Sequence, residues 1–125
     1  MLKESRGSKY DEKIEEAIKK ILRKGYSEIK ASIESYEPPR SIVGQGTTES
    51  EFIPDITAEK WGGMGYFEIA KKESDPTDLA SKWKVLELLA KMKKGEFIIF
   101  VPHGNMQFTQ RIINQYNIQA ELIKL

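Results

Sequence analysis

The chain has 125 residues, one histidine and no cysteine, and its 20 Lys and Arg residues nearly balance its 19 Asp and Glu residues. This length suits one domain, which we expect to span residues 1–125. The composition excludes disulfide scaffolds, thiolate nucleophiles and clusters of several histidines, and the net charge gives no argument for steering toward nucleic acid or membrane. No apolar run approaches the roughly 18 residues of a membrane span, and the polar N-terminus does not resemble a signal peptide, so we expect a soluble, cytoplasmic protein.

The first third of the chain is predicted to contain one helix, one strand and a long loop. Apolar residues at helical spacing predict an amphipathic helix over residues 9–24, ended by Gly25. Residues 28–34 alternate between apolar and polar side chains, as in a half-exposed strand. The breaker-rich stretches 37–40 and 44–50 predict a long connection to the next strand.

A β-hairpin that carries one acid on each strand is predicted next. Its strands are residues 52–58 and 64–72, joined by a loop at residues 60–63. In this register Asp55 lies directly opposite Glu68, where like charges repel unless a cation neutralises them. Two carboxylates with water or phosphate suit Mg²⁺. The hairpin is therefore a candidate metal site.

The remaining elements predict an α/β fold. Asp75 is expected to cap a helix that runs to about Lys93, and the apolar run 97–101 is expected to be a buried strand at the centre of the sheet. Asn105 can cap a third helix, and residues 120–125 form a last strand. The predicted order is α, β, β, β, α, β, α, β, with a mixed central sheet and flanking helices.

This order, joined to the pair Pro54-Asp55 and the later acid Glu68, resembles the PD-(D/E)XK, or restriction-endonuclease-like, nuclease superfamily. The common core of that superfamily is a helix, a three-strand meander, a crossover helix and a further strand. The resemblance covers roughly residues 9–102. It implies that Asp55 and Glu68 hold Mg²⁺ or Mn²⁺ and act on phosphodiester bonds of DNA or RNA.

The lysine of the superfamily pattern does not match. It follows the second acid by two residues, and here that position is Ala70. A two-residue step keeps a side chain on the same face, about 6.8 Å along the strand; Lys71 points to the other face, and Lys72 returns to the acid's face about 13.6 Å along. Lys72 is the candidate catalytic lysine. We expect weak or absent activity in the isolated chain unless a homodimer or a partner subunit supplies the missing group.

Each of these residues also has a structural interpretation. Asp55 can be a turn residue after Pro54, and Glu68 can be a solvated strand residue. Lys72 can form an ordinary cross-strand ion pair with Glu51.

Other polar and aromatic residues leave two interpretations open. Glu15 and Glu16 can be exposed helix charges paired with lysines one turn later, or one of them can approach the metal as in some relatives of the superfamily. His103 is predicted to be a loop residue, and Trp61 can stack on a base or cover the edge of the core. Seven lysines can form a basic groove or the solvated face of a helix: Lys71, Lys72, Lys82, Lys84, Lys91, Lys93 and Lys94.

Two functions follow from the sequence. The first is a Mg²⁺-dependent nuclease, or a subunit of one, with Asp55 and Glu68 as metal ligands and Lys72 as the cation that stabilises developing charge. The second is a binding or assembly module that kept the fold and lost the reaction.

Overall fold

One mixed sheet between two layers of helices forms the core of the protein. A computed structural model describes the backbone of residues 3–43 and 51–125, so the predicted loop at 44–50 lies outside the described residues. The helices are α1 (Lys3–Arg23), α2 (Pro76–Met92) and α3 (Met106–Tyr116). The strands are β1 (Ser27–Ala31), β2 (Ile42–Val43), β3 (Glu51–Phe52), β4 (Ile56–Lys60), β5 (Gly63–Ile69), β6 (Phe97–Val101) and β7 (Glu121–Lys124). None of the helices within these ranges has the length and hydropathy of a membrane span.

The five strands of the main sheet lie in the order β1-β4-β5-β6-β7, and β2 and β3 pair separately. β4 pairs antiparallel with β1 and β5, whereas β5, β6 and β7 run parallel. The predicted α/β class with one mixed central sheet is confirmed. All five residues of β6 are buried as predicted, but β7 adds beyond β6, so the middle strand is β5 and not β6.

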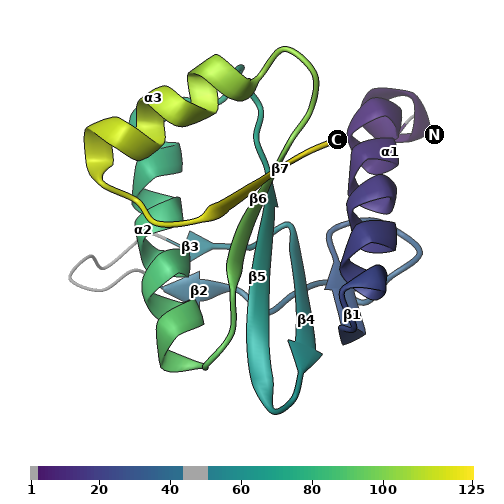
Figure 1. The fold of residues 1–125 in the computed structure, drawn as a ribbon. Coiled ribbons are helices and arrows are strands. Elements are labelled where there is room, and N and C mark those ends of the chain that lie inside the picture. The colour runs from purple at the N-terminus through teal and green to yellow at the C-terminus, as the bar shows by residue number, and fades with distance from the viewer. Residues whose placement is uncertain (1–2, 44–50) are drawn as a thin grey trace.

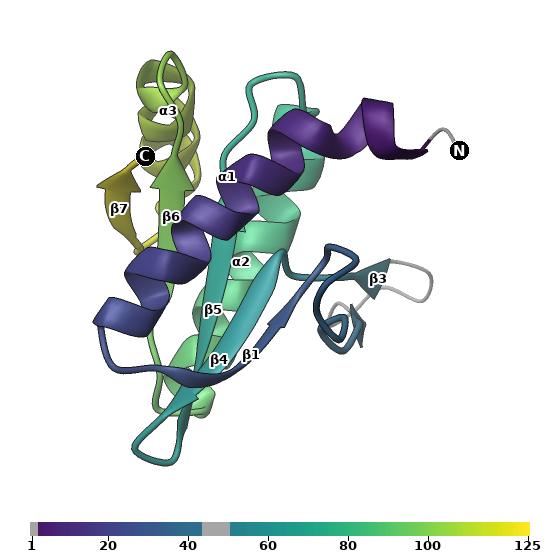
Figure 2. The same cartoon turned by 90° about the vertical axis from the view of Figure 1, so that its right-hand side faces the viewer.

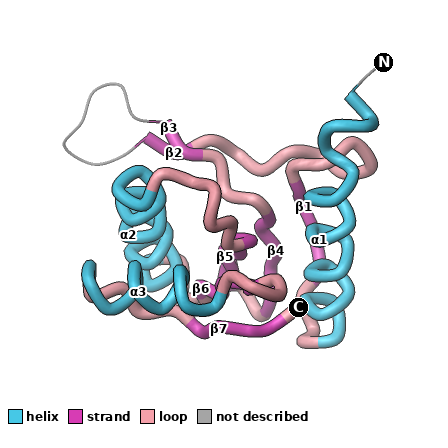
Figure 3. The backbone as a smooth tube through the Cα atoms, turned by 90° about the horizontal axis from the view of Figure 1, so that it is seen from above, coloured by secondary structure: helices cyan, strands magenta, loops and turns pink. Residues whose placement is uncertain are grey.

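The two faces of the sheet are covered by different helices (Figure 1, Figure 3). Figure 2 shows α1 crossing the sheet on the side opposite α2. The apolar stripe of α1 packs on β4, β5 and β6 through Ile14, Ile18 and Ile21. Trp83 and Leu86 of α2 pack on the other face. Because β6 is covered on both sides, its side chains are apolar without alternation.

The ends of the helices follow the sequence signals in two cases of three. Asp75 caps α2 by accepting hydrogen bonds from the N–H groups of Thr77 (2.8 Å) and Asp78 (3.4 Å). Gly25 follows α1 with φ of +97°, the left-handed conformation that ends many helices. Asn105 precedes α3 but makes no side-chain cap. Its side-chain amide instead accepts a hydrogen bond from the N–H of Lys72 and donates to the carbonyl oxygens of Pro102 and His103.

Strand boundaries differ from the prediction around the hairpin. The expected strand 52–58 is split into β3 and β4, because residues 53–55, which lie between these two strands in the chain, are not strand. Trp61 and Gly62, with φ of +52° and +80°, make a two-residue turn where a longer loop was expected. β5 ends at Ile69, so residues 70–72 are not strand, and β1 ends at Ala31 before a turn.

A close backbone contact fixes the end of α2 against β5. A Cβ atom at Gly95 would lie 1.8 Å from the carbonyl oxygen of Met64. Only glycine allows this approach, so the connection between α2 and β6 lies directly on the start of β5.

Candidate functional site

Asp55 and Glu68 meet at the end of the sheet where β4 begins and β5 ends. The pairing of Ile56 with Phe67 places the two acids opposite each other, as the sequence predicted. The backbone N–H of Asp55 donates to Glu68 Oε2 at 2.9 Å, and the N–H of Ile69 donates to Asp55 Oδ2 at 2.8 Å. The residues are 8% and 1% exposed, respectively. Two buried carboxylates therefore share one hydrogen-bonded network.

The cation at this network comes from α2. The Lys82 ammonium lies 3.0 Å from Glu68 Oε2, and the side chain of Lys82 keeps 19% of its surface exposed. The neighbouring Trp83 donates its indole N–H to Glu68 Oε1 at 3.1 Å. Consecutive residues of one helix thus hold both oxygens of Glu68, and the Lys82 side chain keeps part of its surface exposed.

Helix α1 closes the other side of the acid pair. The hydroxyl of Tyr10 donates to Asp55 Oδ1, and the Lys71 ammonium lies 3.9 Å from the centre of the Tyr10 ring. The lysine is within the distance of a cation–π contact. Burial and the charge of Asp55 raise the pKa of Tyr10, so its hydroxyl stays a proton donor at neutral pH.

Two carboxylates and one ammonium leave an excess of negative charge in this network. Burial, followed by the charge of Asp55, raises the pKa of Glu68 to about 7 in spite of the opposing effect of Lys82. Burial alone would lower the pKa of Lys82, but Glu68 and Asp55 raise it, so Lys82 remains protonated. One ammonium does not fully compensate both acids.

We expect the free energy of unfolding in metal-free buffer to fall as the pH rises from about 5 to 8. The folded chain binds a proton at Glu68 more tightly than the unfolded chain, whose pKa is near 4.5, so this stabilisation is complete below pH 4.5 and is lost through pH 7. Urea titrations with EDTA measure it. Glu68→Gln should flatten the profile, and an equal fall in that variant would assign the effect to another group.

Lys72, the lysine predicted from the sequence, lies beyond the end of β5. It is exposed, and its backbone N–H bonds to Asn105 Oδ1 at 2.9 Å. Because the strand ends at Ile69, the strand geometry used to place Lys72 does not apply. Glu51 belongs to β3 and pairs with Val43, so the predicted cross-strand alignment of Glu51 with Lys72 is wrong.

The other candidates stay outside the acid pair. Glu15 and Glu16 are exposed, and Glu16 pairs with Lys13 at 3.8 Å, so neither supplies the extra acid that some relatives of the superfamily use. His103 is an exposed turn residue, as predicted. Trp61 is 94% exposed at the hairpin tip and does not cover the core, so stacking on a base remains a prediction.

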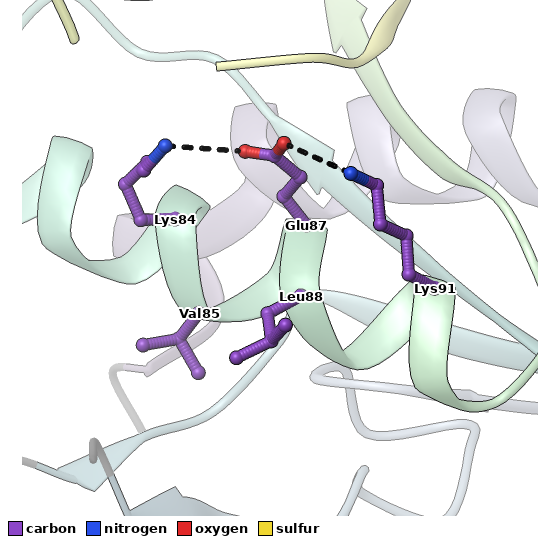
Figure 4. A pocket seen from close by; sticks show the side chains of 5 residues that line it. All are labelled: Lys84, Val85, Glu87, Leu88 and Lys91. Carbon is purple, nitrogen blue, oxygen red and sulfur yellow. Dashed lines mark ion pairs between the residues drawn. The ribbon is translucent and has the colours of Figure 1, made fainter. Parts of the chain in front are cut away.

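The predicted basic face of α2 is partly neutralised. Lys84 and Lys91 share one face and flank Glu87, at 3.6 and 4.0 Å (Figure 4). Together with Val85 and Leu88 they line a hollow of about 340 Å³. Glu87 competes with any phosphate for these two lysines, which favours the solvated-face interpretation for them.

The acid pair offers carboxylate oxygens, the type of donor that Mg²⁺ takes in proteins. In the described part of the chain, no group of three or more His, Cys, Asp or Glu residues could hold a metal, so any site here has two carboxylates. That number is usual for Mg²⁺. Each oxygen of Asp55 accepts one hydrogen bond, and a carboxylate offers about four acceptor positions. The free positions and the uncompensated charge both fit a divalent cation.

Sequence reasoning found the two acids and missed Lys82 and Tyr10. Lys82 lies three residues after Leu79 and four before Leu86, which places a lysine in the apolar stripe of its helix. Tyr10 likewise precedes Ile14 by one turn. A lysine or a hydroxyl-bearing residue within an apolar stripe was the available signal.

No family model matches the chain, and neither a curated protein nor a solved structure matches it.

Proposed function

We propose that the protein is a metal-dependent phosphodiesterase that cleaves nucleic acid, with Asp55, Glu68 and Lys82 as its active site. The observation that carries this proposal is the contact between the Lys82 ammonium and Glu68, in a network where Asp55 and Glu68 already converge. Two acids and one lysine make up the site that the resemblance to PD-(D/E)XK nucleases implies. The helix–strand order from α1 to β6 supports the same comparison.

Lys82 would replace the lysine that the superfamily pattern has at the position of Ala70. The superfamily pattern delivers the lysine from the strand, two residues after the second acid. Here α2 delivers it, from 14 positions later in the chain. The ammonium of Lys82 reaches Glu68 Oε2, which supports Lys82 as the cation of the site; whether the isolated chain has weak activity stays a prediction.

The residues divide the chemistry among them. Asp55 and Glu68 would hold Mg²⁺ or Mn²⁺; when bound, such an ion polarises the phosphate and lowers the pKa of a coordinated water. Lys82 donates hydrogen bonds to charge that develops on the phosphate, as a preorganised group in a site of low polarity. Trp83 orients Glu68, and Tyr10 orients Asp55.

The second candidate is a nuclease-fold binding module without the reaction. All four carboxylate oxygens accept at least one hydrogen bond or ion pair from the protein itself. Such a network is stable without metal. The two functions are separated by metal binding, which only the first requires.

We expect Mg²⁺ or Mn²⁺ to raise the melting temperature of the wild-type chain and not that of Asp55→Asn. An ion present at ten times its Kd stabilises the folded state by about 1.4 kcal/mol, or roughly 4–6 °C for a domain of this size. Differential scanning fluorimetry measures the shift. Glu73→Gln, a change to an exposed acid, is the matched control and should keep the full shift. No shift in the wild type would leave the binding module as the better function.

A further inference from the structure

A cavity of about 490 Å³ is lined by Tyr66 and Leu89, which belong to the apolar cluster on the α2 face of the sheet. It is lined by β1, β4, β5, the last turns of α2 and the segment that leads into β2. Its size falls in the range of about 300–1,000 Å³ typical of small-ligand sites. The described active-site residues Asp55, Glu68 and Lys82 do not line it.

Strand geometry connects the cavity to the active site. Thr57 and Tyr66 are paired across β4 and β5, and both line the cavity. Each is one two-residue step from an acid, Thr57 from Asp55 and Tyr66 from Glu68. Within β5 such a step keeps Tyr66 and Glu68 on one face of the sheet, about 6.8 Å apart along the strand. The cavity and the acid Glu68 therefore share one strand and one face of the sheet.

Two hydroxyl-bearing residues, Thr57 and Tyr66, line this cavity. They are 7% and 6% exposed. Burial raises the pKa of Tyr66, so its hydroxyl stays protonated. A hydroxyl group can both donate and accept a hydrogen bond, so each of these residues can contribute a polar contact to a ligand in the cavity.

The rest of the lining combines three kinds of chemistry. Lys30, Arg40 and Lys93 supply positive charge, Met64 and Leu89 supply apolar surface, and the carboxylates Glu28 and Glu59 accept hydrogen bonds. A ligand that matches all three has an anionic group, a flat apolar part and amino groups. A nucleotide with an amino-bearing base has this combination, since carboxylates accept from the amino group of cytosine.

We propose that the cavity binds one unpaired nucleotide of the substrate strand, next to the phosphate held at the acid pair. This inference rests on the proposed function and adds the substrate class to it. A base that is paired in a duplex cannot enter a cavity walled by a helix and three strands, so the preferred substrate is single-stranded or has an extruded nucleotide. Adenine, guanine and cytosine are favoured over thymine.

The test measures binding separately from cleavage. Asp55→Asn serves as background, in EDTA, with fluorescein-labelled 12-nucleotide oligo(dC), oligo(dT) and a 12-base-pair duplex as probes in anisotropy titrations. Oligo(dC) should bind best. Adding Tyr66→Phe, which keeps the packing, or Arg40→Gln should weaken oligo(dC) binding about three- to tenfold, the loss expected for one hydrogen bond. Lys124→Gln, a change to an exposed residue of β7, is the control and should bind as the background does.

The outcomes separate this inference from the proposed function. Equal binding of duplex and single strand, or equal losses in Arg40→Gln and Lys124→Gln, would overturn the cavity assignment. If the wild-type chain cleaves and Tyr66→Phe cleaves with the same KM, the cavity assignment would be overturned too. The proposal that the protein is a nuclease would then still stand. Loss of oligo(dC) binding in the cavity variants, in a chain that never cleaves with Mg²⁺, would support the cavity and reject the nuclease.

Discussion

Lys82→Gln should lower Mg²⁺-dependent cleavage of a labelled single strand by about 10²–10³ in kcat, the usual cost of removing one preorganised donor from a transition state. The ammonium that contacts Glu68 belongs to Lys82, and the variant replaces it with an uncharged amide on a side chain one atom shorter. Asp55→Asn should abolish cleavage, because it removes a negative charge from the pair that would hold the ion. Denaturing gel electrophoresis of single-turnover reactions measures both losses.

Two lysine variants decide whether the effect is specific. Lys84→Gln is the matched control, because Lys84 lies on the same helix, pairs with Glu87 and points away from the acids. It should cleave as the wild type does. A large loss in Lys72→Gln with little loss in Lys82→Gln would reject the assignment made from the structure and restore the one made from the sequence.

Lys82→Met should destabilise the metal-free fold by about 3 kcal/mol at pH 8, near the lower end of the range for breaking a buried ion pair. The variant leaves Glu68 buried beside Asp55 without its cation, so at pH 8 the folded chain must either keep an unpaired buried charge or take up a proton. At pH 5 the loss should be much smaller: Lys82 lowers the pKa of Glu68, so without it that pKa rises further above 7 and Glu68 is protonated. Urea unfolding at both pH values, with EDTA, measures the difference.

A double variant provides the control for stability. Lys82→Met combined with Glu68→Gln removes both charges, and most of the stability lost at pH 8 should return. A loss of the same size at pH 5 and pH 8 in Lys82→Met would show that Lys82 contributes packing rather than charge.

The acid pair could be predicted because it depends on local signals. Asp55 and Glu68 belong to one hairpin, and their register follows from the alternation of the strands and from a turn at Trp61 and Gly62. An error of two residues in the loop length left the register unchanged, since the loop was shortened by one residue on each side. The predicted position of Asp55 opposite Glu68 was therefore correct in spite of the error in loop length.

The lysine could not be placed from the sequence in the same way. Lys82 meets Glu68 only because α2 packs on the sheet through Trp83 and Leu86, and that packing joins segments distant along the chain. Strand periodicity says nothing about which turn of a helix faces a given strand residue. It pointed to Lys72 instead, on the assumption that β5 continues past Ile69.

The sequence also could not show that β5, and not β6, is the middle strand of the sheet. A continuous apolar run predicts that a strand is covered on both faces, and Phe97 to Val101 are buried. It does not reveal how many strands lie on either side. The position of β7 depends on where the chain returns after α3, which composition does not encode.

Delivery of the lysine by a helix has a mechanical consequence. In a site built wholly on strands, the pleat sets the spacing between acid and lysine, and the rest of the core has little influence on it. Here the spacing depends on where α2 packs on the sheet. The close backbone contact of Gly95 with Met64 fixes that position just beyond the C-terminal end of the helix. From Lys82 to its last residue, Met92, α2 rises about 15 Å, so the lysine lies roughly that far from the anchored end of the helix. If the proposed function holds, substitutions in the buried layer remote from the acids would change the reaction rate by shifting Lys82 relative to Glu68, with no change to Asp55, Glu68 or Lys82 themselves.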